Sequence, residues 1–298
     1  MAQASAETLF GPTAEWRLHL PSGCTLLLGG TQRARIMGIL NATPDSFSDG
    51  GLYDDPSAAL DRMAQMAEEG ADVIDVGGES TRPGAERVPP KEQLRRILPI
   101  IEQAAGRIDI PISVDTTRSE VARAALDAGA QIINDISALR DDPLLAELAA
   151  EQSAPIILMH MRGTPGTMQQ NPTYGDVVEE VRRFLQQQMD VAVRVGVAAD
   201  QIILDPGFGF GKNLEHNLEL LRRLDELGEL GAPVMAGTSR KSMIGQVLGA
   251  SSDDRLFGTL ATVAAAIERG AVMVRVHDVR PAVETARMMA AIQGRSWA

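Results

Sequence analysis

Short apolar runs alternate with helix-like stretches along most of this chain, and each run ends in a polar residue. The runs predict strands at Ile36–Leu40, Val73–Val76, Ile112–Val114, Ile132–Ile133, Ile156–Met159, Ile202–Leu204, Val234–Ala236 and Val272–Val276. The stretches that follow them predict helices at Pro56–Glu69, Lys91–Ala105, Glu120–Ala128, Pro143–Gln152, Asp176–Val195, Leu214–Leu227, Arg255–Arg269 and Val279–Ala291. Eight such units are typical of a (β/α)8 TIM barrel, which is an α/β fold.

A β-hairpin is predicted before the first unit. Trp16–Leu20 alternates with a period of two, Pro21–Gly23 turns, and Cys24–Leu28 continues as a second strand. We expect a flexible tail over residues 1–15 and one barrel domain over 16–298, with the hairpin (16–30) closing the bottom of the barrel. The alternative, a doubly wound open sheet, usually has a glycine-rich turn after its first strand, and Asn41–Ser46 contains none.

Composition limits the binding partners and the cellular compartment that the chain suits. The net charge of −12 argues against nucleic acid or an anionic membrane as a partner. The single Cys24 excludes a disulfide framework within the chain and suits a reducing cytoplasm. We find no signal peptide and no run of the ~18 apolar residues that a membrane span needs. Because only 3% of the residues are aromatic, the core is expected to be aliphatic.

Several familiar catalytic motifs are absent. Gly207–Lys212 is glycine-rich but fits neither a P-loop nor a dinucleotide-binding turn, because Pro206 and Asn213 stand at positions that the P-loop assigns to other residues. The four His and one Cys have no zinc spacing, and no nucleophile elbow occurs. The sequence therefore indicates no covalent nucleophile.

The polar residues at the strand ends are the candidates for chemistry, because TIM barrels place their sites there. Asp115, Asn134 and Asp205 offer acceptors suited to a heterocycle with neighbouring N–H donors. Helix caps or a rim ion pair are the alternative for each residue alone.

Basic residues follow the last two predicted strands. Ser239–Ser242 contains Arg240 and Lys241, and strand alternation puts Arg275 and His277 on one side of the last strand. Loops at these positions often bind phosphate, so a diphosphate site is predicted. An ion pair between Arg275 and a rim carboxylate such as Asp278 is the alternative.

Three long loops follow the first, second and fifth predicted strands, over Asn41–Asp55, Gly77–Pro90 and His160–Gly175. Loops of this length are usually functional lids or disordered segments. Asn41 and the oxygen-rich segment Asp45–Gly51 suit Mg²⁺ carried in by a diphosphate. The loop Gly77–Gly84 could close over an anion, although an ordinary turn has the same composition.

Matching segments give the chain a close resemblance to the dihydropteroate synthase family. They are Ile36–Gly51, Val73–Ala85, Ile112–Thr116, Ile132–Ile136, Leu158–Met161, Leu204–His216, Gly237–Gly245 and Arg275–Val279, in family order. Two minor departures are Ala42, where the family more often has Val, and the first 30 residues, which carry no diagnostic motif. The resemblance implies a pterin-binding barrel that joins 6-hydroxymethyl-7,8-dihydropterin diphosphate to 4-aminobenzoate and releases diphosphate, with the diphosphate cleaved ahead of attack.

The resemblance also implies a role for individual residues. Asn41 would hold Mg²⁺ and, with Lys241, Arg275 and His277, would form the catalytic set. The pterin would be bound by Asp115, Asn134, Met159, Asp205, Phe210 and Lys241. The aminobenzoate and diphosphate pocket would be formed by Phe47, Thr81, Arg82, Pro83, Ser242, Arg275, Val276 and His277. Two further expectations are a homodimer and inhibition by sulfonamides.

Two other functions remain open from the sequence. A methyltetrahydrofolate:corrinoid protein methyltransferase could share the Asp and Asn contacts to a pterin, but would not need the Arg275, His277 and Lys241 anion set. A non-catalytic pterin-binding paralogue should have lost one of the long loops or the Arg–His pair, and this sequence retains them.

Overall fold

The chain folds into a barrel of parallel strands surrounded by helices, as the sequence predicts. The structure is a computed structural model, and it describes residues 14–42, 56–82 and 84–297. The barrel strands are β3 (Arg35–Asn41), β4 (Val73–Gly77), β5 (Ile112–Asp115), β6 (Ile132–Asp135), β7 (Ile156–Met159), β8 (Ile202–Asp205), β9 (Met235–Ala236) and β10 (Met273–Val276). The helices are α1 (Ser57–Glu68), α2 (Pro90–Ala104), α3 (Ser119–Asp127), α4 (Leu144–Gln152), α5 (Val177–Arg194), α6 (Leu214–Arg222), α7 (Ser242–Leu248), α8 (Leu256–Glu268) and α9 (Val279–Ile292).

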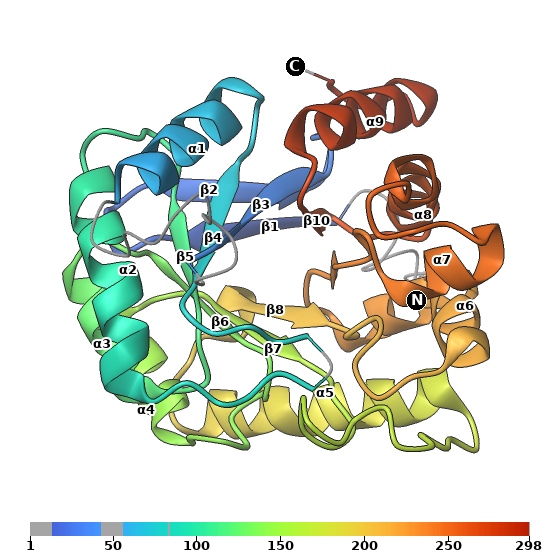
Figure 1. Ribbon diagram of the computed structural model, residues 1–298, viewed down its shortest axis with the longest axis horizontal. Helices are drawn as coiled ribbons and strands as arrows, with labels where there is room; N and C mark the ends of the chain where they lie inside the picture. Colours follow the sequence, from blue (N-terminus) through green and yellow to red (C-terminus); the bar gives the residue numbers. More distant parts are fainter. Residues whose placement is uncertain (1–13, 43–55, 83, 298) are drawn as a thin grey trace, which may run out of the picture.

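The strands form one parallel sheet that closes on itself (Figure 1). Their order in the sheet is β8-β7-β6-β5-β4-β3-β10-β9. A parallel bridge between Leu204 and Val234 joins the two ends, and the Leu204 N–H donates to the Pro233 carbonyl at 2.9 Å. The TIM barrel prediction is therefore confirmed.

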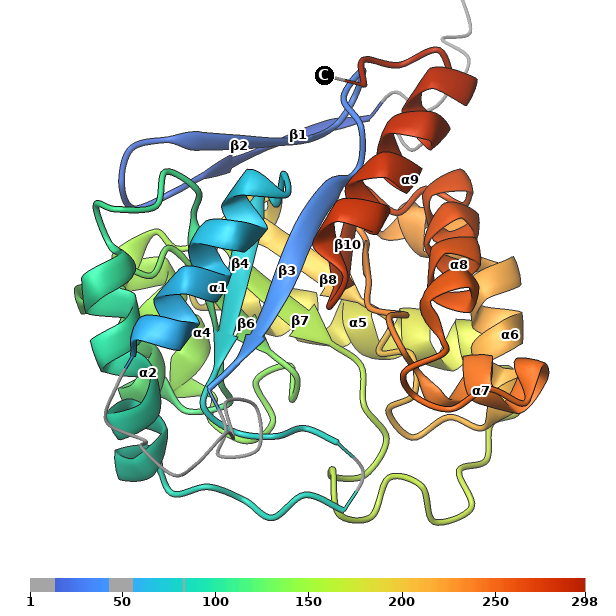
Figure 2. The same ribbon diagram turned by 45° about the horizontal axis from the view of Figure 1, so that its top comes forward.

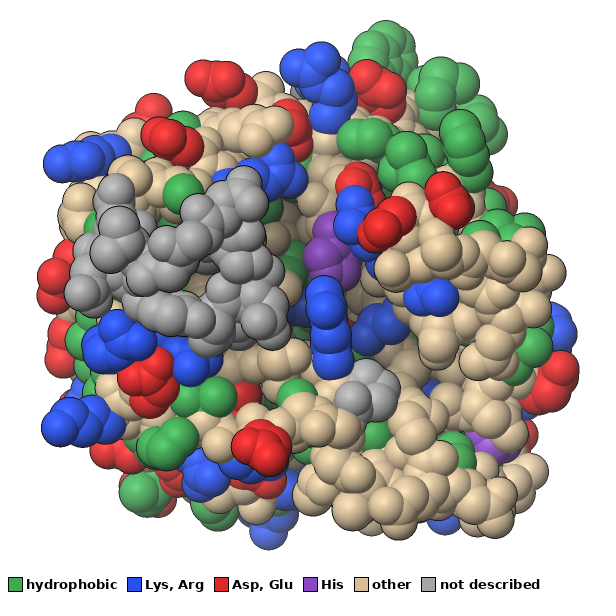
Figure 3. All heavy atoms as spheres, in the orientation of Figure 1, with side chains coloured by type: hydrophobic (Ala, Val, Ile, Leu, Met, Phe, Trp, Pro, Cys, Tyr) green, Lys and Arg blue, Asp and Glu red, His purple; other side chains and the backbone are tan. Residues whose placement is uncertain are grey.

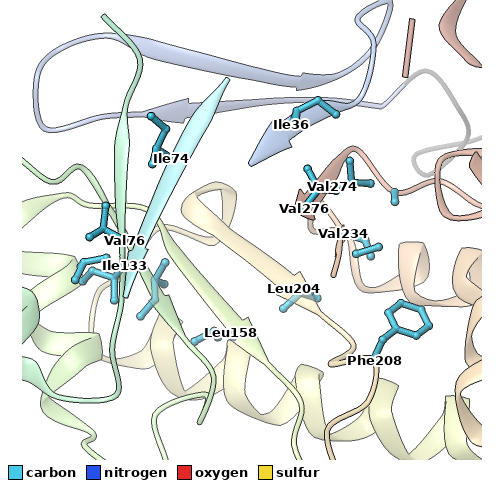
Figure 4. Packing of buried hydrophobic residues seen from close by; sticks show 14 of the residues in the cluster. Ile36, Ile74, Val76, Ile133, Leu158, Leu204, Phe208, Val234, Val274 and Val276 are labelled. Atoms are coloured by element: carbon cyan, nitrogen blue, oxygen red, sulfur yellow. The ribbon is translucent and has the colours of Figure 1, made fainter. Parts of the chain in front are cut away.

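The strands alternate side chains between two environments. One row, which includes Ile36, Ile74, Val76, Val274 and Val276, points outward and packs against the helices (Figure 4). The other row points into the barrel, and its lowest members form a separate apolar layer made of Met37, Val73, Ile132, Ile157, Ile203, Met235 and Met273. Residues two positions further along each strand therefore point to the upper interior.

The predicted hairpin closes the lower end of the barrel. β1 (Glu15–His19) pairs with β2 (Thr25–Gly29) in antiparallel register, and the hairpin lies across the end opposite the loops that follow β4 and β7 (Figure 2). Leu18 and Leu28 are buried against the lower interior layer. Glu15, which we expected in the flexible tail, instead begins β1; residues 1–13 lie outside the described residues.

Two helix predictions are corrected. The predicted helix Leu214–Leu227 ends at Arg222 and continues as a 3-10 segment, η3 (Leu224–Leu230). Leu224, Leu227 and Leu230 are all buried, because a period of three residues keeps them on one face. The short helix α7 was not predicted, since its seven residues follow the basic segment directly.

Candidate active site

The polar side chains predicted at the strand ends converge in the upper interior of the barrel. Each comes from an inward position: Asp115 on β5, Asn134 on β6, Met159 on β7, Asp205 on β8 and Arg275 on β10. Lys, Arg and His side chains gather around a hollow at the centre of this face (Figure 3). The predicted clustering of these side chains is therefore confirmed.

Arg275 joins two strands on the other side of the interior. Its Nε donates to Oδ2 of Asp75 at 2.6 Å, and its Nη2 donates to Oδ2 of Asp115 at 2.8 Å. Burial alone would lower the pKa of Arg275, but the two carboxylates raise it above its ordinary value, so the guanidinium remains charged. The alternative that Arg275 is ion-paired to a carboxylate is therefore confirmed, but its partners are Asp75 and Asp115; Asp278 pairs with Arg240 at 2.6 Å instead.

Asn134 is tied to the same cluster. Its Nδ2 donates to Oδ2 of Asp75 at 2.9 Å, and both side chains are buried. Asp75 therefore accepts hydrogen bonds from two residues that the sequence assigns to different halves of the site, the pterin pocket and the diphosphate pocket.

Two carboxylates face the mouth in a poorly solvated setting. Burial raises the pKa of Asp115 to about 7, and the negative charges of Asp75 and Glu79 add to this increase. The positive charge of Arg275 opposes it. Burial also raises the pKa of Asp205, against the Gly207 N–H, which donates to Asp205 Oδ1 at 2.7 Å, and against Lys241 and Arg275. The raised pKa favours the protonated form of each carboxyl before a ligand binds, and N–H donors from a ligand would favour the ionised form.

Lys241 lies on an apolar wall. Its Nζ is 4.1 Å from the centre of the Phe210 ring, within the range of a cation–π contact. Burial lowers the pKa of Lys241 to about 8, while Asp205 opposes the shift. Phe210 packs in a small cluster with Ile136, Met159, Met161 and Met168, which gives the site a hydrophobic surface for a flat ring.

The glycine-rich segment after β8 is held by a buried lysine. Lys212 Nζ donates to the carbonyls of Gly207 and Phe210 at 2.9 and 3.2 Å and lies 2.8 Å from Nδ1 of His160. Gly207 has φ +68°, and a Cβ there would lie 2.0 Å from the His160 carbonyl oxygen, so only glycine fits. The segment is a rigid support for Asp205 and Phe210 rather than a phosphate loop.

His277 enters the mouth as a neutral donor. Burial, followed by Arg275 and Arg240, lowers its pKa to about 3. Ser239 Oγ accepts from the His277 backbone N–H at 3.2 Å and lies 3.0 Å from Nδ1. In the tautomer in which the hydroxyl donates to Nδ1, the Nε2–H is left as a donor for an anion.

The other predicted site residues occupy varied positions. The Val276 side chain is buried in the outer core between strands and helices, so only its backbone could line the predicted diphosphate pocket. Thr81 and Arg82 lie in the loop after β4, and Ser242 is the exposed first residue of α7. Asn41 is the last residue of β3, at an inward position. Phe47 and Pro83 lie outside the described residues.

The sequence analysis missed three residues that organise the site. Asp75 was hidden inside the apolar run Val73–Val76, although a charged residue at an inward strand position is a usable signal. Lys212 was given no role, because the glycine-rich segment that contains it matches no phosphate-binding motif. Ser239 was noted only as a neighbour of Arg240 and Lys241.

Known proteins share both the sequence and the fold. Residues 37–277 match the family described as "Pterin binding enzyme". The chain is 50% identical over 274 residues to the dihydropteroate synthase of Synechocystis sp., which covers 92% of this chain and 94% of that protein. It is 49% identical over 256 residues to the dihydropteroate synthase of Escherichia coli (strain K12), with coverage of 86% and 90%.

Solved structures of dihydropteroate synthases have the same fold as this chain. A Xanthomonas albilineans dihydropteroate synthase with 4-aminobenzoic acid has a TM-score of 0.87 and 45% identity, over 95% of this chain and 100% of that one. The same species' enzyme in complex with 7,8-dihydropteroate has a TM-score of 0.83 and 42% identity, over 94% and 100%. The fold and site define a pterin-binding barrel enzyme. Within that class, the chain belongs to the dihydropteroate synthase family, and the predicted resemblance is confirmed.

Removal of Arg275 should be costly for folding, because it leaves Asp75 and Asp115 buried without a cation. We expect Arg275→Ala to lower the free energy of unfolding by about 3–5 kcal/mol at pH 8. Arg240→Ala, which breaks only the more exposed pair with Asp278, should cost less than about 1 kcal/mol. Urea denaturation measures both, and equal losses would contradict a structural role for the Arg275 cluster.

Binding of a pterin should depend on pH. If the ring donates N–H bonds to Asp115, its affinity should rise as the pH increases towards 7, by up to about tenfold per pH unit, because the carboxyl must lose its proton. Above about pH 8 the affinity should fall as Lys241 loses its charge. Calorimetric titration from pH 5.5 to 9 measures the profile. The acid limb should disappear in Asp115→Asn, and an affinity that is constant over this range would remove both residues from the site.

Proposed function

We propose that this chain condenses 6-hydroxymethyl-7,8-dihydropterin diphosphate with 4-aminobenzoate to give 7,8-dihydropteroate and diphosphate, as part of folate biosynthesis. The observation that carries the proposal is the arrangement of the barrel mouth. Carboxylate acceptors (Asp115 and Asp205), an apolar wall (Phe210 and Met159) and cationic or N–H donors (Arg275, Lys241 and His277) converge from separate strands.

The pterin is recognised by its N–H edge. Asp205 has Oδ1 occupied by the Gly207 N–H, and Asp115 has Oδ2 occupied by Arg275, so each carboxylate retains an oxygen for a ligand. Phe210 and Met159 provide the surface on which the ring lies. Such an acceptor set suits an aminopyrimidine ring and disfavours a ring that presents only carbonyl groups at that edge.

The reaction needs a good leaving group more than a nucleophilic residue. The C–O bond between the pterin methylene and the diphosphate breaks, the electron-rich ring stabilises the positive charge on the methylene, and the amine of aminobenzoate attacks that carbon. The amine nitrogen then loses a proton. Arg275, Lys241 and the Nε2–H of His277 stabilise the departing diphosphate, and the long loops keep water away from the cation.

Mg²⁺ would be carried by the diphosphate, whose charge it neutralises when bound. The donor set fits that arrangement, because the carboxamide oxygen of Asn41 is a hard ligand at an inward position, and Mg²⁺ usually keeps substrate phosphates and waters as its other ligands. No group of three His, Cys, Asp or Glu residues that could hold a metal occurs among the described residues. We assign Asn41 as the protein ligand.

The cytoplasm is the proposed location. Cys24 is an exposed free thiol, a state that reducing compartments preserve. In the described part of the chain, no helix is both long and apolar enough to cross a membrane. The acidic net charge makes nucleic acid and anionic membranes poor partners.

We also propose a homodimer through the face made by α7, α8 and α9. Large apolar side chains are exposed there, at Val247, Leu248, Phe257, Met288 and Ile292. Phe257 is 81% exposed, and α8 packs directly beside α9. Exposed apolar patches of this kind usually mark interfaces.

Diphosphate release in the presence of both substrates tests the function. We expect release only when both the pterin diphosphate and 4-aminobenzoate are present, with formation of dihydropteroate. EDTA should abolish the release, and added Mg²⁺ should restore it. Transfer of methyl to a corrinoid protein, or pterin binding without turnover, would favour the other two functions. Full activity in metal-free buffer would contradict the metal assignment alone.

Sulfonamides, which resemble 4-aminobenzoate in size and charge, should inhibit the chain. A Yersinia pestis dihydropteroate synthase with a sulfonamide drug has a TM-score of 0.87 and 44% identity to this chain, over 93% of this chain and 99% of that one. Thr81 and Arg82 lie in the loop after β4, outside the Arg275 cluster. We therefore expect the 4-aminobenzoate pocket to form only after the pterin diphosphate has bound. Sulfonamide affinity should therefore be negligible for the free enzyme and rise with diphosphate and Mg²⁺. Equal binding under both conditions would refute ordered assembly.

A charge in the apolar face should disrupt the dimer. We expect Phe257→Glu to be monomeric at micromolar concentration in sedimentation velocity experiments, because a carboxylate would be buried without a partner. The control is Leu144→Glu, since Leu144 is similarly apolar and 55% exposed but lies on α4. A wild-type chain that sediments as a monomer would contradict the proposal, as would a dimer that Phe257→Glu leaves intact.

A further inference from the structure

Asp75 is a fully buried carboxylate for which the reaction described above has no use. It lies in the middle of β4, with 0% of its surface exposed. Its Oδ2 accepts from Arg275 Nε at 2.6 Å and from Asn134 Nδ2 at 2.9 Å. Its Oδ1 has no hydrogen-bond partner among the described residues. Burial of a carboxylate destabilises the fold unless the charge is paired, so these two hydrogen bonds must have good geometry.

The first hydrogen bond decides which way the Asn134 carboxamide faces. An amide has a donor nitrogen and an acceptor oxygen on opposite sides, and rotation by 180° exchanges them. With Asp75 beside it, the reversed amide would place Oδ1 against a carboxylate oxygen. Asp75 therefore holds Nδ2 towards itself and turns Oδ1 of Asn134 away, where it can serve as an acceptor.

The second hydrogen bond fixes the plane of the Arg275 guanidinium. Asp75 binds Nε and Asp115 binds Nη2, so two strands hold one rigid group from two sides. A planar guanidinium that is held at two nitrogens cannot turn, and its remaining N–H groups keep a set direction. One oxygen of Asp75 thus orients a pterin-binding amide and an anion-binding cation together.

We propose that Asp75 is the positioning residue of the site, which makes Asn134 an acceptor and aligns Arg275, and so specifies a ligand with N–H donors along its edge. This inference rests on the proposed function, because it deepens how the same pocket reads a pterin. Asp75 touches neither substrate. It acts through Asn134 and Arg275, and what it supplies is an acceptor oxygen at one place rather than a negative charge alone.

Substitutions can separate the acceptor from the charge. Asp75→Asn removes the charge but retains an oxygen that can accept from both Arg275 and Asn134. Asp75→Leu removes both the charge and the acceptor. Asp72→Leu is the matched control, because Asp72 is another largely buried carboxylate that bridges two arginines, Arg33 at 2.7 Å and Arg35 at 3.0 Å, but at the opposite end of the barrel.

Calorimetric titration with 6-hydroxymethylpterin, together with thermal unfolding, measures the effects. We expect Asp75→Leu to weaken binding about 10- to 100-fold, the range for loss of a charged hydrogen-bond partner. Asp75→Asn should stay within about fivefold of the wild type, because its oxygen preserves both orientations. Asp72→Leu should lower the melting temperature but leave the affinity within about threefold of the wild type, because distant sites act independently.

Other outcomes would overturn the proposal. Equal weakening by Asp75→Asn and Asp75→Leu would mean that the charge, not the orientation, matters, and wild-type affinity in Asp75→Leu would mean that Asp75 has no role. If Asp75→Leu does not fold, Asp75→Ser replaces it, because the serine oxygen is too short to reach both donors and should lose affinity in the same way. Failure of the wild-type chain to bind the pterin at all would instead refute the proposed function.

Discussion

A single guanidinium, Arg275, makes it possible for this barrel to have a charged interior. Asp75 and Asp115 project inward from neighbouring strands, and in an apolar setting each would destabilise the folded state by several kcal/mol if unpaired. Arg275 reaches both from β10, at 2.6 and 2.8 Å. Removal of Arg275 would leave both carboxylates buried without their cation. Arg275 also links β10 to β4 and β5, which are far from it in the chain. These contacts lie towards the C-terminal ends of the strands, where TIM barrels form their sites.

The lower half of the barrel interior is apolar and lies beneath the charged cluster. An apolar layer fills the interior below the cluster, and Leu18 and Leu28 of the hairpin cover it. This apolar layer covers the charged cluster from below, so the electrostatic interactions in the mouth act in a medium of low polarity. The raised pKa of Asp115 and the lowered pKa of Lys241 and His277 follow from this burial.

Most of the fold and much of the site follow from the sequence pattern alone. Strand runs such as Ile156–Met159 were predicted at their observed bounds, because fully buried parallel strands read as continuous apolar segments. Asp115, Asn134 and Asp205 were found because each directly follows such a run, and Arg275 because it interrupts the last one. Alternation also indicates that the Val276 side chain, at the opposite parity to Arg275, faces the helices.

Other features depend on contacts between distant residues, which a local pattern does not contain. Nothing near Asp75 in the sequence indicates that Arg275 and Asn134 meet it, since the partners are 200 and 59 residues away. The helix α7 and the change to a 3-10 segment after Arg222 likewise depend on packing. The neutral state of His277 depends on its neighbours in space, not on its neighbours in sequence.

A crystal structure of the chain with 6-hydroxymethylpterin tests the central claim most directly. The claim is that buried acceptors, oriented by the Arg275 cluster, read the N–H edge of the ring. We expect the ring to lie against Phe210 with its N–H groups about 3 Å from Asp115, Asp205 and Oδ1 of Asn134, while Arg275 stays bound to Asp75. A ring bound elsewhere, or one that meets the nitrogen of Asn134 instead of its oxygen, would contradict the account.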